Sequence, residues 1–285
     1  MSIINHPGPE ISEALAREIA EAHFGLSGPI SRLASERDQN FHFGGSGKGA
    51  VLKIVNAAEP EQALRFQVAM IGHIKRIDPG LAVPPVRLSK SGEELPVIEG
   101  NKGERHLIRV VDYLAGTPLA EKPKSPALLA SFGSFLGRLD RALQSFGHAG
   151  AHRDLDWDLR KVGRSRPRLA ALHDPEERAI CEYFLDRFER IVEPRLMKLR
   201  ASVIHNDPND WNVLVSDDGS EISGLIDFGD ALHTALIAEI AVAAAYAILD
   251  ADDPLGAVAH MLKAYHQELP LLEAEVDLQI GRAHV

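Results

Sequence analysis

The sequence predicts an α+β chain of two unequal lobes, a small β-rich lobe followed by a larger, mainly helical one. Three observations support this fold class. Most strand-like patterns fall before residue 114, a Gly- and Pro-containing break occupies residues 115–118, and helical periodicity dominates after it. We therefore expect residues 1–112 to form the N-terminal lobe and residues 113–285 to form the C-terminal lobe.

The first lobe begins with a predicted helix over residues 11–24, in which Ser12 is a possible cap and Gly25 a stop. Strands are expected at residues 30–34, 39–43, 50–55, 83–88 and 106–114, with a helix over residues 60–77 between the third and fourth. The glycine-rich run at 44–49 does not fit a P-loop, because the motif needs Gly where His42 stands and Ser or Thr where Gly49 stands. We interpret this run as a turn between two strands.

The second lobe contains four longer helical patterns and two short strand-like pieces. The helices are expected at residues 128–144, 175–199, 235–249 and 256–267, and the strands at 202–205 and 213–215. The segment 235–249 is apolar on nearly every side, which predicts a buried helix.

Composition narrows the possible function classes. The 285 residues are 45% hydrophobic and 25% charged, which is typical of a globular chain. A formal net charge of −10 argues against a nucleic-acid-binding surface and is better suited to a cationic small substrate. One cysteine, Cys181, cannot form an internal disulfide, and no apolar run reaches the ~18–20 residues of a membrane-spanning helix. We expect a cytoplasmic chain with no membrane or nucleic-acid partner.

The strongest chemical signal lies in residues 203–230, VIHNDPNDWNVLVSDDGSEISGLIDFGD. Asp207 and Asn212 stand on one tight loop, and Asp227 follows an apolar strand, so the three side chains can converge. Phosphoryl transfer needs a carboxylate for the attacking hydroxyl and two oxygen ligands that hold Mg²⁺ against nucleotide phosphates. Any one of these residues could merely mark a turn, but their order and spacing together favour a catalytic residue, Asp207, and a metal site, Asn212 and Asp227.

This segment resembles the catalytic and metal loops of the aminoglycoside phosphotransferase and choline kinase superfamily, the small-molecule relatives of protein kinases. Finer details are similar to its hydroxylysine-kinase-like branch. These details are residues 35–41 (SERDQNF), Arg153 with Trp157 and Asp158, residues 205–212 (HNDPNDWN), and DFGD followed by residues 238–241 (AEIA). The resemblance covers residues 30–270 approximately and implies a two-lobed protein-kinase-like fold with a nucleotide-binding N-terminal lobe.

The resemblance also implies how a nucleotide is held. Lys53, in the strand sequence VLKI, fits the lysine that contacts the α and β phosphates. Family members pair this lysine with a helix Glu, but the aligned position here is Gln67 and the nearest acid is Glu61, which puts the ion pair in doubt. The phosphate-covering loop falls at residues 33–40, where Ser35, Asn40 and backbone N–H groups could meet phosphate oxygens or simply form a turn. The adenine edge is expected to bond the backbone of Asp112, Tyr113 and Leu114.

Substrate contacts are less well defined. Trp157, Asp158, Asp230 and Glu239 are candidates, because an amine-bearing substrate favours carboxylates or an aromatic face, but each could equally be a structural residue. Arg153 could bind a substrate carboxylate, or pair with Asp154 or Asp156. His205 is expected to be a packed scaffold residue.

The resulting expectation is a small-molecule kinase that uses Mg²⁺ and ATP or GTP to phosphorylate a hydroxyl of an amine or amino-alcohol, with 5-hydroxylysine favoured by the resemblance. The alternatives are an aminoglycoside or homoserine-type kinase, or a nucleotide-binding pseudokinase. Residues 280–285 (IGRAHV) do not continue the helical pattern of residues 271–278, so we expect that the natural chain continues beyond them. The resemblance implies that this continuation adds helices or a fused domain.

Overall fold

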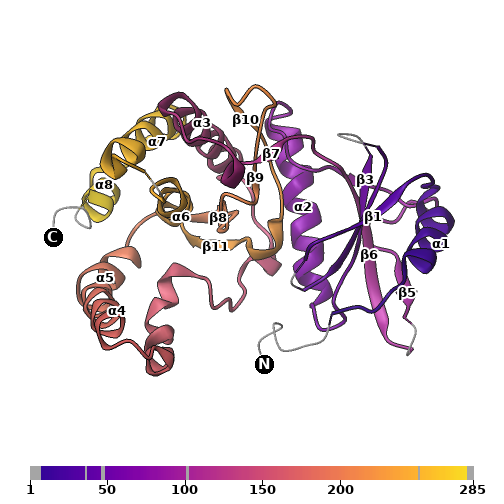
Figure 1. Ribbon diagram of the computed structural model, residues 1–285, viewed down its shortest axis with the longest axis horizontal. Helices are drawn as coiled ribbons and strands as arrows, with labels where there is room; N and C mark the ends of the chain where they lie inside the picture. The colour runs from indigo at the N-terminus through magenta and orange to yellow at the C-terminus, as the bar shows by residue number, and fades with distance from the viewer. Residues whose placement is uncertain (1–7, 36, 46–48, 101–102, 250, 281–285) are drawn as a thin grey trace. The chain divides into compact units, whose positions relative to one another are not determined.

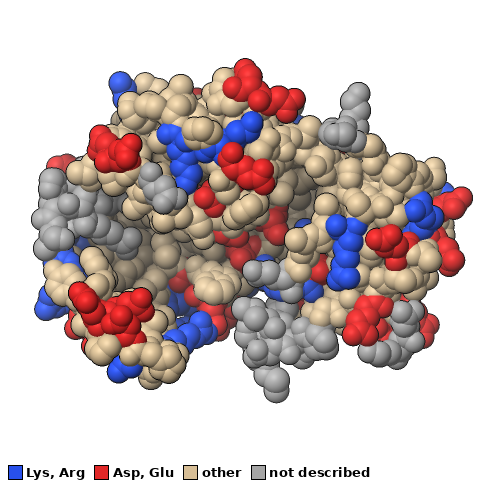
Figure 2. All heavy atoms as spheres, viewed as in Figure 1, with Lys and Arg blue, Asp and Glu red and all other residues tan. Residues whose placement is uncertain are grey.

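The computed structural model describes residues 8–35, 37–45, 49–100, 103–249 and 251–280, and it has the predicted α+β composition. The chain divides into two compact units. The N-terminal unit comprises Met1–Thr117 and Ser223–Ile226, and the C-terminal unit comprises Pro118–Ile222 and Asp227–Val285. Within the described part of the chain, no helix has the length and hydropathy needed to cross a bilayer. On the face shown in Figure 2, basic side chains are interspersed with acidic ones.

The N-terminal unit is an antiparallel sheet with a helix on each face (Figure 1). Its elements are α1 (Glu13–Phe24), β1 (Ile30–Leu33), β2 (Gln39–Phe43), β3 (Ala50–Ile54), α2 (Glu61–Ile77), β4 (Val86–Arg87), β5 (Val97–Glu99) and β6 (Arg105–Asp112). The strand order is β1-β2-β3-β6-β4, and β5 pairs with another part of β6. The glycine-rich run joins β2 to β3, which pair from Phe43 and Ala50 onward, and its residues 46–48 lie outside the described part.

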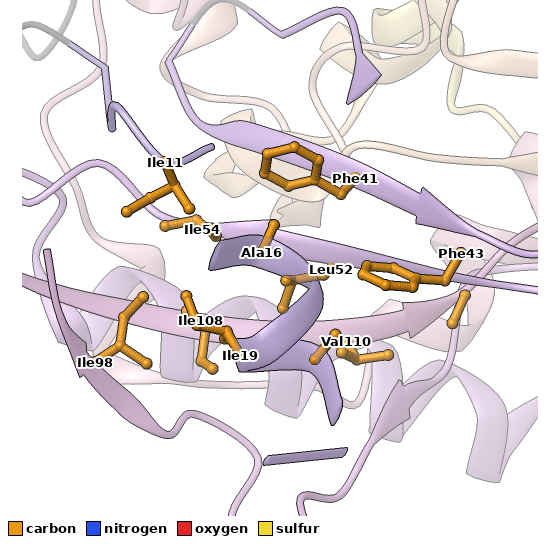
Figure 3. Close-up of a cluster of buried hydrophobic side chains, with 12 residues drawn as sticks. Ile11, Ala16, Ile19, Phe41, Phe43, Leu52, Ile54, Ile98, Ile108 and Val110 are labelled. Carbon is orange, nitrogen blue, oxygen red and sulfur yellow. The ribbon is translucent and has the colours of Figure 1, made fainter. Parts of the chain in front are cut away.

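Alternation of side chains assigns the two faces of this sheet. Phe41, Leu52 and Val110 point to one side and pack with Ile19 of α1 in an apolar cluster (Figure 3). Burying a side chain such as the inaccessible Phe41 contributes about 1.5–3 kcal/mol. Because successive residues of a strand face opposite ways, the intervening residue Lys53 points to the other face. That face carries α2.

The predicted helix caps are confirmed for α1. Ser12 Oγ accepts a hydrogen bond from the N–H of Leu15 at 3.2 Å, and Gly25 adopts a left-handed conformation with φ 66°. The predicted strand at 83–88 is reduced to the two residues of β4, because Pro84 and Pro85 have no N–H to contribute to the ladder.

The C-terminal unit is mainly helical. Its helices are α3 (Pro126–Leu143), α4 (Pro175–Arg187), α5 (Glu193–Leu196), α6 (Ile237–Ala247), α7 (Pro254–Glu268) and α8 (Glu273–Ile280). Shorter turns are η2 (Leu119–Glu121), η3 (Ala149–Ala151), η4 (Leu159–Ala171), η5 (Phe188–Val192) and η6 (Phe228–Asp230). The strands β8 (Ala201–Ile204) and β11 (Leu232–Ala235) form one antiparallel pair, and β9 (Val213–Val215) is a further short strand. The strands β7 (Thr117–Pro118) and β10 (Ile222–Leu225) each span a boundary between the two units.

The helix predicted at residues 175–199 is confirmed as a helical run that ends at Leu196. The run changes from α-helix to a π-helical turn over Phe188–Val192 and then continues as the four-residue α5. Pro194 in the first turn of α5 has no N–H for a helical hydrogen bond, so the regular α-helical pattern is disturbed just before it. The sequence reading also missed η4, β5 and β11.

Candidate phosphoryl-transfer site

The turn between β8 and β9, residues 205–212, is named here the Asp207 loop. Each carboxylate oxygen of Asp207 accepts one side-chain amide: Asn209 Nδ2 donates to Oδ1 at 2.9 Å and Asn212 Nδ2 donates to Oδ2 at 2.9 Å. Asn212 Nδ2 also reaches the main-chain oxygen of Asp207 at 3.0 Å. In turn, Asn209 Oδ1 accepts the N–H groups of Trp211 and Asn212 at 2.9 and 3.0 Å. The network fixes the direction in which the Asp207 carboxylate points.

Two buried residues anchor the start of this loop. The ring of His205 is fully buried and lies edge-on against Phe228, with the centroids 4.7 Å apart, and its Nδ1 accepts the N–H of Asp207 at 3.3 Å. Asn206 has a left-handed backbone with φ 70°, and its N–H donates to Glu239 Oε2 at 2.7 Å. His205 therefore has the packing that its scaffold role predicts.

Asp227 stands at a second sharp turn, two residues after the end of β10. Its φ of 60° is also left-handed, and its carboxylate accepts the N–H of Gly229 at 3.2 Å. Arg153 supports the same turn from outside, because its Nη1 donates to the Gly229 carbonyl at 2.8 Å. The Asp227 side chain is solvent-exposed, so it is accessible to a ligand.

Burial and neighbouring carboxylates raise the pKa of Asp207 to about 6. Desolvation is the largest cause, and the negative charges of Asp230 and Asp227 add to it, while the hydrogen bonds from Asn209 and Asn212 oppose it. The loop and the turn therefore bring three carboxylates close enough to repel one another, an arrangement that favours binding a cation.

The oxygen atoms of this cluster fit a magnesium ion that also takes phosphate ligands. Because the Nδ2 group of Asn212 is held by Asp207, the Oδ1 atom is the one left to act as a ligand, and Asp227 contributes a carboxylate. Within the described residues, no three or more His, Cys, Asp and Glu side chains form a complete metal cage. Two protein oxygens suit Mg²⁺, which keeps several waters and binds phosphate oxygens.

In the N-terminal unit, three polar side chains follow one another across the face that carries α2. The strand register places Asn40 opposite Lys53 and Lys53 opposite Arg109. Gln67 of α2 is buried, and its Oε1 lacks a hydrogen-bond partner among the residues that the structure describes. Glu61 instead forms an ion pair with Arg65 at 2.6 Å, so it is engaged on its own helix.

The predicted phosphate-covering loop is tied to the end of β3. Asp38 Oδ1 accepts the N–H of Asn56 at 3.1 Å, and Asn56 Nδ2 donates to the carbonyl of Arg37 at 3.3 Å. Ser35 is exposed beside this tie, and Glu36 lies outside the described residues. Asp38 therefore has a local structural role.

Part of the backbone of residues 112–114 is already hydrogen-bonded within the protein. The N–H of Asp112 donates to the Pro85 carbonyl at 3.0 Å, and the N–H of Tyr113 donates to the Gly49 carbonyl at 3.2 Å. The carboxylate of Asp112 pairs with Arg87 at 2.6 Å. A nucleotide base is thus expected to use the carbonyl groups of this segment or the N–H of Leu114.

The phosphotransferase enzyme family (APH) matches residues 29–274. The chain belongs to this family. Hydroxylysine kinase of Bos taurus is 28% identical over 290 residues, which cover 94% of this chain and 77% of that protein. Homoserine kinase of Methylobacillus flagellatus is 32% identical over 199 residues, covering 69% of this chain and 57% of that protein.

Among solved structures, an amicoumacin kinase in complex with AMP-PNP, Ca²⁺ and Ami shares the fold, with a TM-score of 0.72 at 18% identity over 95% of this chain and 84% of that chain. The predicted superfamily and the kinase-like α+β fold are therefore confirmed. The chain is a small-molecule phosphotransferase that acts on a hydroxyl group, as the sequence predicted, and its family implies a nucleotide as phosphoryl donor.

The substrate candidates of the phosphotransferase differ in their accessibility. Trp157 is exposed and Asp230 is half-buried near Asp207, so both are accessible to an acceptor. Glu239 is fully buried and holds the Asn206 N–H, which does not fit direct substrate contact. Asp158 is buried as well and accepts hydrogen bonds from Thr234 Oγ1 at 2.7 Å and from Arg160.

Arg153 is half-buried and holds the turn of Asp227 through the Gly229 carbonyl. Its neighbour Asp154, one expected partner, forms ion pairs with Lys161 and Arg164.

Sequence reasoning missed Asn209 of the phosphotransferase, which shares the Asp207 carboxylate with Asn212. A signal was available, since Asn209 stands two residues after Asp207, where a short amide side chain can close a local turn. It also missed Arg109, a buried cation beside Lys53, because burial of one arginine in a strand leaves no mark on the sequence pattern.

Proposed function

We propose that this phosphotransferase transfers the γ-phosphoryl group of ATP or GTP to a hydroxyl of a small amine or amino-alcohol, with 5-hydroxylysine as the favoured acceptor. The observation that carries the proposal is the Asp207 carboxylate, held by the amides of Asn209 and Asn212 beside Asp227 and Asp230. The similarity to hydroxylysine kinase along 94% of this chain supports this acceptor. The surrounding carboxylates also favour an acceptor that carries an ammonium group.

Each residue has a defined part in the proposed reaction. Asp207 orients the acceptor hydroxyl and takes its proton as the new O–P bond forms, while the bond between the γ-phosphorus and the bridging oxygen breaks and ADP or GDP leaves. Asn212 Oδ1 and the Asp227 carboxylate hold Mg²⁺, which neutralises charge on the phosphates when it is bound. Because little covalent chemistry falls to the protein, the rate gain comes from positioning and electrostatic stabilisation.

The N-terminal unit is proposed to bind the nucleotide. Lys53 contacts the α and β phosphates, while Ser35, Asn40 and the backbone around them approach the phosphate oxygens. The segment from Asp112 through Tyr113 to Leu114 contacts the base. Burying a lysine in a sheet costs less when an anion pairs with it, which supports a phosphate partner for Lys53.

A coupled assay of ADP or GDP release tests the proposal. The panel comprises 5-hydroxylysine, homoserine, an aminoglycoside and simple amino-alcohols, each with ATP and with GTP. We expect the highest kcat/KM with 5-hydroxylysine. Homoserine is the second candidate because a homoserine kinase is 32% identical over 69% of this chain.

The Asp207→Asn variant tests the assignment of the base. Loss of the proton acceptor should lower kcat by about 10²–10⁴-fold and leave the Kd of Mg²⁺–nucleotide nearly unchanged. Asp217→Asn, an exposed carboxylate on the turn after β9, is the matched control and should keep full activity. If the wild-type chain binds nucleotide but consumes none with any acceptor, a pseudokinase role is correct instead.

A further inference from the structure

Lys124 is a mostly buried cation next to the Asp207 loop. It lies between η2 and α3 in the C-terminal unit, and its side chain is only 16% exposed. Its Nζ donates to the main-chain oxygen of Tyr246 at 2.6 Å and lies 3.5 Å from Oδ2 of Asp210. A lysine loses hydration and rotamer freedom on such burial, so these two contacts must offset a real cost.

Asp210 belongs to the Asp207 loop, three residues after Asp207 and two before Asn212. Its side chain is 12% exposed, and its main-chain oxygen accepts the N–H of Ala120 at 2.9 Å. A buried carboxylate needs a compensating charge, and Lys124 supplies it. Both the backbone and the side chain of Asp210 are therefore held by residues 120–124.

The other contact of Lys124 is to the end of α6. Tyr246 is in the last turn of this helix, where main-chain oxygens lack helical partners and where a cation is favourable. Near the other end of the same helix, Glu239 holds the N–H of Asn206. One helix thus fixes the Asp207 loop at two points, through Glu239 at its beginning and through Lys124 near its end.

We propose that Lys124 is a positioning residue of phosphoryl transfer, which ties Asp210 to the end of α6 and so fixes the distance between Asp207 and Asn212. The proposal rests on the proposed roles of those two residues. Lys124 touches neither substrate nor metal in this scheme. It acts only through the loop.

Replacing Lys124 by Met leaves Asp210 buried without its cation and releases the loop from α6. A shift of about 1 Å in a reacting group can cost on the order of 10²-fold in rate. We therefore expect Lys124→Met to lower kcat by about 10–100-fold, with a nucleotide KM within about twofold of the wild type. Lys124→Arg keeps the charge. Its log kcat should therefore recover at least about a third of the decrease that Lys124→Met causes.

Lys122→Met is the matched control. Lys122 stands two residues earlier and makes one long contact, 3.5 Å from its Nζ to the main-chain oxygen of Asp217, so its loss should leave kcat unchanged. Asp210→Asn weakens the same link from the loop side. Lys124→Met should therefore cause little further loss of kcat when it is added to Asp210→Asn. Fully additive losses in the double variant, or a Lys124→Met enzyme with wild-type kcat, would overturn the proposal.

A second readout keeps the test independent of turnover. The chain has two tryptophans, Trp157 and Trp211, and Trp211 lies in the Asp207 loop between Asp210 and Asn212. In a Trp157→Phe background, time-resolved fluorescence anisotropy of Trp211 reports the local mobility of the loop. We expect faster local motion after Lys124→Met and near-normal motion after Lys124→Arg.

This readout separates two failures. One outcome is that the wild-type chain phosphorylates none of the acceptors while Lys124→Met still increases the local mobility of Trp211. In that case the proposed function is wrong, and the positioning of the loop by Lys124 is supported. If Trp211 is unaffected while melting temperature falls, Lys124 stabilises the fold without positioning the loop, and the inference is wrong.

Discussion

At the scale of single residues, the charge of Asp207 sets the pH dependence. Its pKa of about 6 exceeds the ordinary value of 3.8, mainly through burial and then through Asp230 and Asp227. A base must be deprotonated to act, so kcat/KM should rise with pH through about 6 and then level off. Removing a negative neighbour makes ionisation easier, so Asp230→Asn should move this rise to lower pH. Profiles of kcat/KM between pH 4.5 and 8.5 measure both effects.

The control for this prediction is Asp218→Asn, because Asp218 is an exposed carboxylate on the turn between β9 and β10. Its profile should coincide with that of the wild type. A rise that stays at the same pH in Asp230→Asn would show that the two carboxylates do not interact.

Glu239 links pH to stability. Burial is the main cause that raises its pKa from 4.5 to about 8, and the charge of Asp207 adds to it. The folded state therefore holds a proton more tightly than the unfolded state, and this contribution is present at low pH and lost as pH rises through about 8. Glu239→Gln keeps an acceptor for the Asn206 N–H and cannot ionise. Its melting temperature relative to the wild type should rise steadily between pH 5 and pH 9.

Thermal unfolding of both proteins at each pH measures this difference. As a control, Glu221→Gln changes an exposed carboxylate in the turn before β10 and should give a difference that is flat with pH. A flat difference for Glu239→Gln as well would mean that Glu239 ionises in the folded state as it does in the unfolded chain.

The residues that sequence reasoning found are those whose spacing carries the chemistry. Asp207, Asn212 and Asp227 are arranged around a predicted strand, turn and strand, and this order can be read from the sequence without a structure. Glu239 was misjudged because its complete burial depends on how α6 packs, which no local pattern records. Lys124 went unnoticed because its partners are distant in sequence, with Tyr246 separated from it by 122 positions.

At the scale of elements, the packing of α3 on α7 depends on two glycines. A Cβ added at Gly133 would lie 2.1 Å from the Met261 carbonyl oxygen, and one at Gly137 would lie 2.9 Å from that of Tyr265. Backbone atoms in a packed helix pair cannot move aside cheaply. Gly133→Ala should therefore destabilise the protein by about 1–3 kcal/mol, measured by denaturant unfolding.

Gly72→Ala is the matched control. Gly72 lies inside α2, and an added Cβ would meet no atom within 4 Å. Alanine is a better helix former there, so this variant should gain about 1 kcal/mol. A neutral or stabilising Gly133→Ala would contradict the close approach of α3 and α7.

Elements with local signals were predictable. Ser12 and Gly25 mark the two ends of α1, and apolar residues at every second position, Phe41 and Phe43, indicate β2. Both signals lie within a few neighbouring residues, so they can be read from the sequence. The π-helical turn after Arg187 and the strand β11 were missed. A π-helical turn depends on tertiary packing, and β11 is a four-residue strand that is defined by pairing with β8.

At the scale of the whole molecule, binding of a magnesium nucleotide should stabilise the fold. A ligand that binds only the folded state adds about 2.7 kcal/mol at 100 times its Kd. We expect a rise in melting temperature with ATP or GTP and Mg²⁺, and a much smaller rise when EDTA removes the metal, because Asp207, Asp227 and Asp230 then repel the phosphates. Thermal shift with and without chelator measures this.

The control is Asp227→Asn, which removes one expected metal ligand. It should lose most of the magnesium-dependent part of the shift, and its shift with EDTA should be at least as large as that of the wild type because one repelling charge is gone. An equal shift in both proteins would argue against Asp227 as a ligand.

The fold class itself was predictable because strand patterns and helical patterns occupy different halves of the chain. The division into units was harder to foresee. Residues 223–226 belong with the N-terminal unit although they stand more than one hundred positions beyond Thr117, and only long-range pairing such as Leu225 with Ala82 reveals this.

The left-handed backbone at Asn206 and Asp227 has a consequence for mutational tolerance. Among the described non-glycine residues these two have positive φ, and glycine is the residue that adopts such angles most cheaply. A library that scores abundance should therefore rank glycine high at both positions, while one that scores growth on enzyme activity should reject glycine at Asp227, where the carboxylate is needed. The two rankings should diverge most at this position and would reveal where chemistry, rather than folding, constrains the choice of amino acid.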